Sequence, residues 1–321
     1  MDLVNAPPSP PAPESRSVPV PGTTLTAWRW QRPARVPGAA PARVLFAHGI
    51  SDDGRCWDPI VTALWASHPG AVDAVAYDAR GHGRSQPLGC AGSPGALGRA
   101  GADHLAPPRA ATVPPAPATL ARLADDLIAV AGALGLERPL LVGHSMGAMT
   151  AALAEARAPG LARGLLLEDP PSPWAPLPGP LPAAVARGEE RPPLPTWLAA
   201  LRGRAPAEIA AEGRRERPGW PEDELAPWAA AKSAVAADVG WLFLSLREDW
   251  SRDLARVGCP VLVLAGDPAR GGLLPPNDAA RLVALFGAGS LERVSGAGHN
   301  VRRDARPAFL AALRRTLAAA G

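Results

Sequence analysis

One stretch near the middle of the chain constrains the fold more than any other. Residues 139–149 read PLLVGHSMGAM, and the apolar run 140–142 is typical of a strand buried on both faces. The run 148–158 is rich in Ala, Leu and Met and contains no Gly or Pro, which favours a helix. Gly143 and Gly147 flank Ser145, so we expect the serine on a sharp strand-to-helix turn where larger neighbours would clash.

Such a turn, called a nucleophile elbow, exposes the serine hydroxyl above the N-terminus of the following helix, which favours negative charge. A serine hydroxyl needs an imidazole base, and that base needs a group that fixes its tautomer. In chains with this elbow the order is serine, acid, histidine. Of the six histidines only His299 follows Ser145, so we expect His299 to be the base.

A second loop is expected to stabilise the oxyanion that forms when the serine attacks a carbonyl. His48 and Gly49 follow a predicted strand at 43–47, which would place the amide of Ile50 beside the nucleophile. The amide of Met146, directly after Ser145, would be the other donor.

The acid has three candidates, because carboxylates follow two of the later predicted strands. Glu168 and Asp169 come after the strand at 164–167, and Asp267 comes after the strand at 261–264. Ligands gather at the carboxyl ends of strands in parallel sheets, so each position suits a catalytic role. Each could equally be a cap or turn residue.

Predicted strands alternate with predicted helices over most of the chain, which indicates an α/β fold with a doubly wound, mostly parallel sheet. The other strands are expected at 25–31, as an edge strand, and at 72–77 and 291–294; helices are expected at 57–66, 120–136, 277–286 and 304–319.

Three segments depart from this alternation. Residues 1–24 are rich in proline and are expected to form a disordered tail. Residues 86–118 are rich in Pro, Gly and Ala with little periodicity, which predicts a flexible insertion. Residues 172–248 hold or adjoin six of the ten tryptophans and predict an inserted helical lid, with helical pieces at 194–204 and 222–235. The lid would divide the core into 25–171 and 249–321.

Composition excludes several classes of protein. The three cysteines are far apart and have no zinc-site spacing, so we expect neither a metal nor a disulfide framework, and no cofactor motif is present. No basic cluster with interleaved aromatic residues indicates nucleic-acid binding. No secretory signal or apolar run long enough to span a membrane is visible, so a cytoplasmic protein with a small-molecule substrate is expected. The oligomeric state stays open.

Together these motifs make the chain from about residue 25 to 321 resemble the α/β-hydrolase superfamily. The resemblance is carried by His48-Gly49, the 78–85 loop (DARGHGRS), the 143–147 pentapeptide (GHSMG) and Gly298-His299. It implies a triad of Ser145, an acid and His299, with a lid after the sixth core strand.

The acid departs from the commonest pattern of this superfamily. Many relatives have an aspartate where this chain has Gly271, ahead of Leu273-Leu274-Pro275. In lacking an aspartate there, the chain resembles the haloalkane dehalogenases, whose acid follows the preceding core strand. The corresponding position is Asp169, with Asp267 and Glu168 as alternatives.

The nucleophile then indicates the reaction. A serine nucleophile disfavours halide displacement and epoxide opening, which use a carboxylate nucleophile. We therefore expect hydrolysis of a carboxylic ester or related acyl bond in a small, largely apolar substrate, through an acyl-enzyme. Alternatives are carbon–carbon bond hydrolysis of a diketone by the same triad, and a non-catalytic member of the fold that binds a small molecule.

Overall fold

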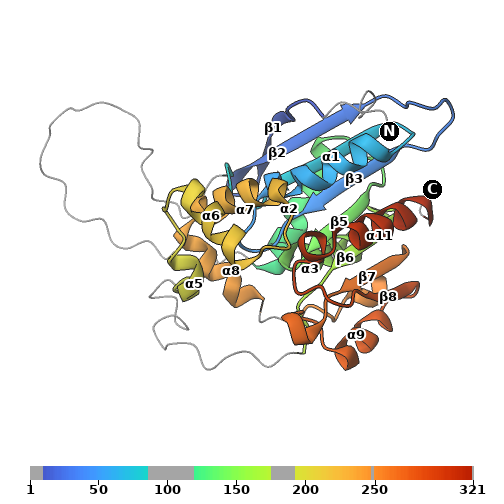
Figure 1. Cartoon of the computed structure of the whole chain (residues 1–321). Helices are drawn as coiled ribbons and strands as arrows, with labels where there is room; N and C mark the ends of the chain where they lie inside the picture. The colour runs from blue at the N-terminus through green and yellow to red at the C-terminus, as the bar shows by residue number, and fades with distance from the viewer. Residues whose placement is uncertain (1–9, 86–118, 175–191, 247–248, 320–321) are drawn as a thin grey trace, which may run out of the picture.

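A computed structural model of the chain describes residues 10–85, 119–174, 192–246 and 249–319. Its eight strands form one sheet in the order β1-β2-β4-β3-β5-β6-β7-β8, in which β2 runs antiparallel to β1 and β4 and the remaining pairs are parallel. The predicted doubly wound, mostly parallel sheet is confirmed (Figure 1). The predicted insertion at 86–118 lies outside the described residues. The strands are β1 (Glu14–Val20), β2 (Thr23–Arg32), β3 (Ala42–Ala47), β4 (Val72–Asp78), β5 (Leu140–His144), β6 (Gly164–Glu168), β7 (Val261–Ala265) and β8 (Gly289–Arg293).

Helices cover both faces of this sheet. The described core helices are α1 (Asp58–Ser67), α2 (Leu120–Ala133), α3 (Met146–Arg157), α9 (Pro276–Val283), α10 (Val301–Asp304) and α11 (Arg306–Ala319). Apolar side chains of α2, α3 and α9 pack on one face, and those of α1 and α11 pack on the other. Side chains along a strand alternate between the faces, so Leu141 of β5 faces α2 and α3 while Leu140 and Val142 face α1 and α11. This double burial explains the unbroken apolar run before the serine.

The N-terminal segment corrects two predictions. Residues 14–20, expected within the disordered tail, form β1, and β2 is therefore an internal strand rather than an edge strand. The proline content predicted disorder, but β1 lies at the edge of the sheet and pairs on one side only. Proline at position 19 lacks a backbone N–H, and on the unpaired side of an edge strand that N–H needs no partner. Gly22, with φ 79°, makes the turn that joins β1 to β2.

The chain between β6 and β7 contains helices that lie beside the sheet core (Figure 1). The described ones are α5 (Thr196–Ala199), α6 (Pro206–Glu216), α7 (Glu222–Ala234) and α8 (Gly240–Ser245). Helices α6 and α7 enclose a small apolar cluster in which the rings of Trp220 and Trp228 meet edge to face at 5.6 Å. α5 covers only part of the helix predicted at 194–204, and residues 175–191 of the predicted lid lie outside the described part of the chain.

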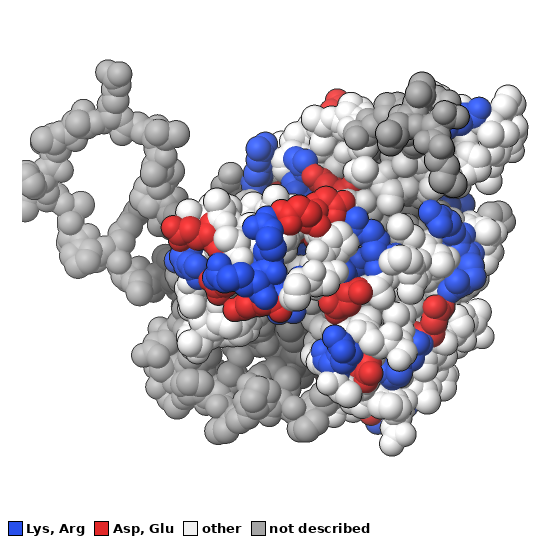
Figure 2. Space-filling view, in the orientation of Figure 1, with Lys and Arg blue, Asp and Glu red and all other residues white. Residues whose placement is uncertain are grey.

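The outer surface of α6 and α7 carries paired charges. Acidic and basic side chains lie side by side over these two helices (Figure 2). Ion pairs in this part of the chain include the exposed pair Arg214–Glu222 and the partly buried pair Arg204–Glu212. None of the helices in the described ranges is long and apolar enough to cross a bilayer.

Candidate active site

Ser145 occupies the sharp turn that the sequence predicts between β5 and α3. Its backbone lies at φ 53° and ψ −117°, a combination that non-glycine residues rarely adopt. A Cβ on Gly143 would lie 2.2 Å from the carbonyl oxygen of Gly147, and a Cβ on Gly147 would lie 2.1 Å from that of Ala47. Both glycines are therefore required by close backbone approach around the serine.

Replacing Gly147 by alanine should destabilise the fold strongly, because the new methyl group meets backbone atoms at the end of β3. We expect the free energy of unfolding, measured by urea denaturation, to fall by about 3 kcal/mol or more. Gly132, exposed near the end of α2, is the control: no atom lies within 4 Å of its added Cβ, so Gly132→Ala should stabilise the protein by about 0.5–1 kcal/mol. Equal stability of the two variants would contradict the close-approach argument.

His299 lies in the loop between β8 and α10 and contacts one of the three candidate acids. Its Nδ1 lies 2.7 Å from Oδ2 of Asp169, which is fully buried. The two oxygens of Asp169 also accept hydrogen bonds from the amides of Gly266 and Leu273, at 3.0 and 2.8 Å. Asp169 itself has a positive φ of 40°. A strained turn and two amides thus direct the carboxylate toward the imidazole.

The other two candidate acids have different partners. Both oxygens of Glu168 bind Arg302, one through the backbone amide at 2.7 Å and one through the guanidinium at 3.0 Å. Asp267 accepts a hydrogen bond from the amide of Ala269 at 2.9 Å and caps a short 3₁₀ turn. The His299 contact therefore distinguishes Asp169 from both alternatives.

His144 joins the serine turn to the histidine loop. Its Nε2 donates to the backbone carbonyl of His299 at 3.1 Å, and the two ring centroids are 4.7 Å apart. Burial, with Arg302 and His299 nearby, holds the pKa of His144 well below its ordinary value. A Cβ on Gly49 would lie 2.7 Å from Nδ1 of His144 and 3.5 Å from Cβ of Ser145. The serine turn, the histidine loop and the loop after β3 thus meet at the carboxyl ends of the strands.

Hydrogen bonds to two successive backbone carbonyls hold the loop after β3 in place. The Gly49 carbonyl accepts from Nδ1 of His48 at 2.8 Å and from the amide of Asp52 at 2.9 Å, and the Ile50 carbonyl accepts from Nε2 of His82 at 2.6 Å. Burial, together with His82, lowers the pKa of His48 to about 3, so this ring is neutral. Within the described ranges, neither the Ile50 amide nor the Met146 amide donates to a protein acceptor.

Asp53, in the same loop, should make stability depend on pH. Burial, together with Asp78 and Asp52, raises its pKa to about 7. Because the unfolded carboxyl ionises near pH 4, the folded protein binds more protons between about pH 4 and 7, and the free energy of unfolding falls as pH rises through that interval. Asp53→Asn keeps a side-chain oxygen that accepts from the Arg55 amide. It removes the ionisable group, and with it the loss of stability as the pH rises.

We therefore expect Asp53→Asn to gain stability relative to wild type as the pH is raised. The gain should be larger at pH 8.5 than at pH 5, by up to about 3 kcal/mol, in chemical denaturation at both pH values. A difference between the two proteins that is the same at both pH values would show that Asp53 does not titrate in this way.

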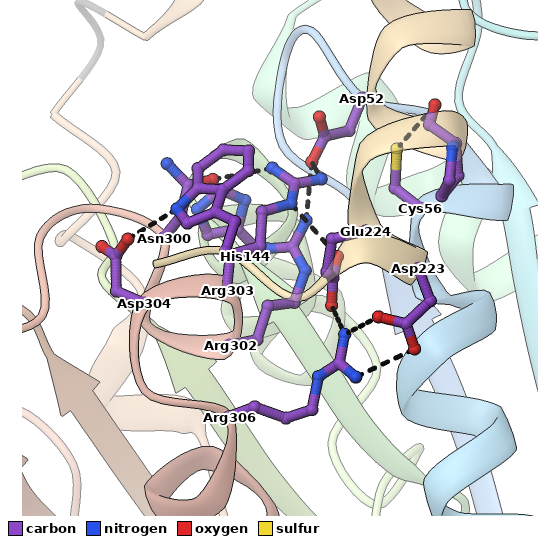
Figure 3. A network of polar contacts seen from close by, with 12 residues as sticks. Asp52, Cys56, His144, Asp223, Glu224, Asn300, Arg302, Arg303, Asp304 and Arg306 are labelled. Atoms are coloured by element: carbon purple, nitrogen blue, oxygen red, sulfur yellow. Dashed lines mark hydrogen bonds and ion pairs between the residues drawn. The ribbon is translucent and has the colours of Figure 1, made fainter. Parts of the chain in front are cut away.

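A buried charge network lies beside these loops and was not predicted from the sequence; Figure 3 shows its part around Asp52, Arg302 and Arg303. Asp52 binds Lys232, Arg302 and Arg303, and Arg302 also binds Glu168. One available signal was that Lys232, the only lysine of the chain, lies in an apolar stretch. Among the described residues, no group of three or more His, Cys, Asp or Glu side chains is arranged to hold a metal ion.

Comparison with known proteins places the chain in a family. The model of the alpha/beta hydrolase family matches residues 44–313. The chain is similar to N-formylmaleamate deformylase of Pseudomonas putida, with 32% identity over 192 residues that cover 59% of this chain and 67% of that protein.

Solved structures agree at the level of the fold. The structure is similar to that of E-2-(acetamidomethylene)succinate hydrolase, with a TM-score of 0.63 and 21% identity over 95% of this chain and 99% of the other. It is also similar to a thioesterase domain from the curacin biosynthetic pathway, with a TM-score of 0.62 and 21% identity over 95% of this chain and 100% of that domain. Since the family model spans most of the sequence, the chain belongs to the alpha/beta hydrolase family, as its motifs predict.

Proposed function

We propose that this protein is a serine hydrolase that cleaves a carboxylic ester or related acyl bond through Ser145, His299 and Asp169. The observation that carries the proposal is the 2.7 Å contact between His299 and Asp169, in a loop that His144 joins to the strained serine turn. With Nδ1–H donating to the carboxylate, Nε2 is the unprotonated nitrogen that can accept the serine proton.

The proposed reaction has two halves. In the first, Nε2 of His299 takes the proton from Oγ of Ser145 as Oγ attacks the substrate carbonyl, and the amides of Ile50 and Met146 bind the oxyanion. The protonated His299 then gives its proton to the leaving group, and the acyl-enzyme forms. In the second half, His299 takes a proton from water as the water oxygen attacks the acyl carbon. His299 then returns that proton to Oγ of Ser145 as the bond between Oγ and the acyl carbon breaks, which releases the acid product and free Ser145.

We propose an apolar acyl group, because the core cluster that contains Ile50 and Met146 is apolar and extends into the segment between β6 and β7. Ile50 and Met146 belong to the same apolar cluster as Leu198 and Leu242 of the segment between β6 and β7, and Trp174 and Trp241 pack against it. We propose that this segment acts as a lid that shields the acyl group from water. The match to a deformylase supports including amides among the acyl substrates to be tested.

The test is a panel of p-nitrophenyl esters of increasing acyl length, with matched thioesters, formyl amides and an aliphatic diketone, each with Ser145→Ala as the blank. Turnover of at least one acyl class that the blank lacks supports the proposal. Cleavage of the diketone alone would replace it with carbon–carbon bond hydrolysis. Absence of turnover together with absence of fluorophosphonate labelling at Ser145 would favour a non-catalytic binding protein.

A further inference from the structure

The buried carboxylate of Asp52 binds cations from two other parts of the fold. Its Oδ1 accepts from Nζ of Lys232 at 2.7 Å, and its Oδ2 accepts from Arg302 and Arg303 at 2.6 and 2.9 Å. All four side chains are at most 4% exposed. Burial alone would raise the pKa of Asp52, but Arg303, Lys232 and Arg302 together hold it well below its ordinary value.

Each partner comes from a segment that also carries part of the proposed active site or adjoins it. Asp52 follows Ile50 by two residues, and Arg302 and Arg303 follow His299 in α10 (Figure 3). Lys232 alone comes from α7, in the segment between β6 and β7. The Asp52 carboxylate therefore joins α7 to the two catalytic loops.

Lys232 also contacts the backbone of the loop after β3. Its Nζ donates to the carbonyl oxygen of Ser51 at 2.9 Å. With the contacts of His48 and His82, the carbonyls of Gly49, Ile50 and Ser51 are each held by a side chain. The Ile50 amide belongs to the same peptide as the Gly49 carbonyl, and the peptides that carry the Ile50 and Ser51 carbonyls follow it directly in the loop.

Stability alone does not require the lysine. A buried ion pair gains little over well-packed apolar side chains, because desolvation offsets most of the attraction. Without Lys232, Asp52 keeps both guanidinium partners, and burial already lowers the pKa of the lysine. Nζ also lies 5.6 Å from the ring centroid of Trp228 in a cation–π contact, which a methionine would replace with a contact between its sulfur and the ring.

We infer that Lys232 is a positioning residue: by joining α7 to Asp52 and to the Ser51 carbonyl, it holds the Ile50 amide where the transition-state oxyanion forms. The inference rests on the proposed hydrolase function. It implies that docking of α7 is coupled to the competence of the oxyanion site. A helix outside the sheet core thereby affects the chemical step and not only substrate access.

The test compares Lys232→Met and Lys232→Arg with the control Arg214→Met, which breaks the exposed pair between α6 and Glu222 of α7. For Lys232→Met we expect kcat to fall about 10- to 100-fold with KM changed less than about threefold, because only transition-state binding is lost. Lys232→Arg should recover most of the loss, and Arg214→Met should match wild type.

A transition-state analogue separates positioning from folding. Phenylboronic acid forms a bond from Oγ of Ser145 to boron and places a boron-bound oxygen in the oxyanion site, so its inhibition constant should weaken in Lys232→Met by about the same factor as kcat. Should Lys232→Met fail to fold by circular dichroism, Lys232→Gln, which keeps a donor without the charge, takes its place.

The outcomes also distinguish this inference from the proposed function. Wild-type turnover that Ser145→Ala abolishes establishes the hydrolase before any lysine variant is scored. If the folded lysine variant then keeps wild-type kcat, or loses kcat with no change in phenylboronic acid affinity, the positioning role is overturned while the hydrolase stands. Parallel losses in both measurements support it.

Discussion

Ser145→Ala should lower kcat on the best acyl substrate by about 10⁴- to 10⁶-fold, the largest loss expected from any single substitution in this chain. The hydroxyl is the proposed nucleophile, and no other group at the turn can form the acyl-enzyme in its place. The residual rate should still exceed that in water, because the proposed oxyanion donors and the apolar surroundings remain. Steady-state kinetics against the uncatalysed rate measures both quantities.

Folding should survive this substitution. Ser145 keeps its φ of 53° through backbone contacts, including the hydrogen bond from its amide to the Glu168 carbonyl at 2.9 Å, and alanine can make the same contacts. We expect the thermal midpoint to stay within a few degrees of wild type. A Ser145→Ala protein that turns over ester at a rate near wild type would remove the nucleophile from the proposed mechanism.

Asp169→Asn should lower kcat by about 10³- to 10⁴-fold. An amide in place of the carboxylate can present its NH₂ group to Nδ1 of His299, which favours the tautomer with the proton on Nε2. That tautomer cannot accept the serine proton. The measurement is kcat across a range of pH on the same substrate, with circular dichroism to establish folding.

The neighbouring candidate acids supply the controls. Asp267→Asn should leave kcat within about twofold, because asparagine also caps the short turn that Asp267 begins. Glu168→Gln should lower the free energy of unfolding, because it removes the buried negative charge that binds both the amide and the guanidinium of Arg302. If Asp267→Asn abolishes turnover while Asp169→Asn does not, the assignment of the acid is wrong.

The parts of the fold that could be predicted are those encoded by neighbouring residues. The strand, turn and helix around Ser145 depend on an apolar run, two glycines and an alanine-rich segment, all within about twenty residues, and the structure has them as predicted. The strands at 164–168 and 261–265 were predicted within one residue for the same reason. The prediction for β1 was wrong because an edge strand tolerates proline, and edges are set by the whole sheet.

Long-range contacts limited what could be predicted of the site. Three carboxylates remained open as the acid because the distinction depends on amides 97 and 104 residues beyond Asp169 and on a positive φ that no local motif indicates. The network around Asp52 was missed for a similar reason: its partner Lys232 is 180 residues away, and Arg302 is 250 residues away. Spacing along the chain carries no information about such convergence.

The central claim is that Ser145 and His299 act together, and the rate of fluorophosphonate labelling tests it most directly. The account predicts that intact-mass and peptide analysis will find one adduct, on Ser145, and that His299→Ala will slow its formation by about 10³-fold or more while the protein stays folded. Labelling of Ser145 at the same rate in wild type and His299→Ala, or no labelling of Ser145 in the folded wild-type protein, would contradict it.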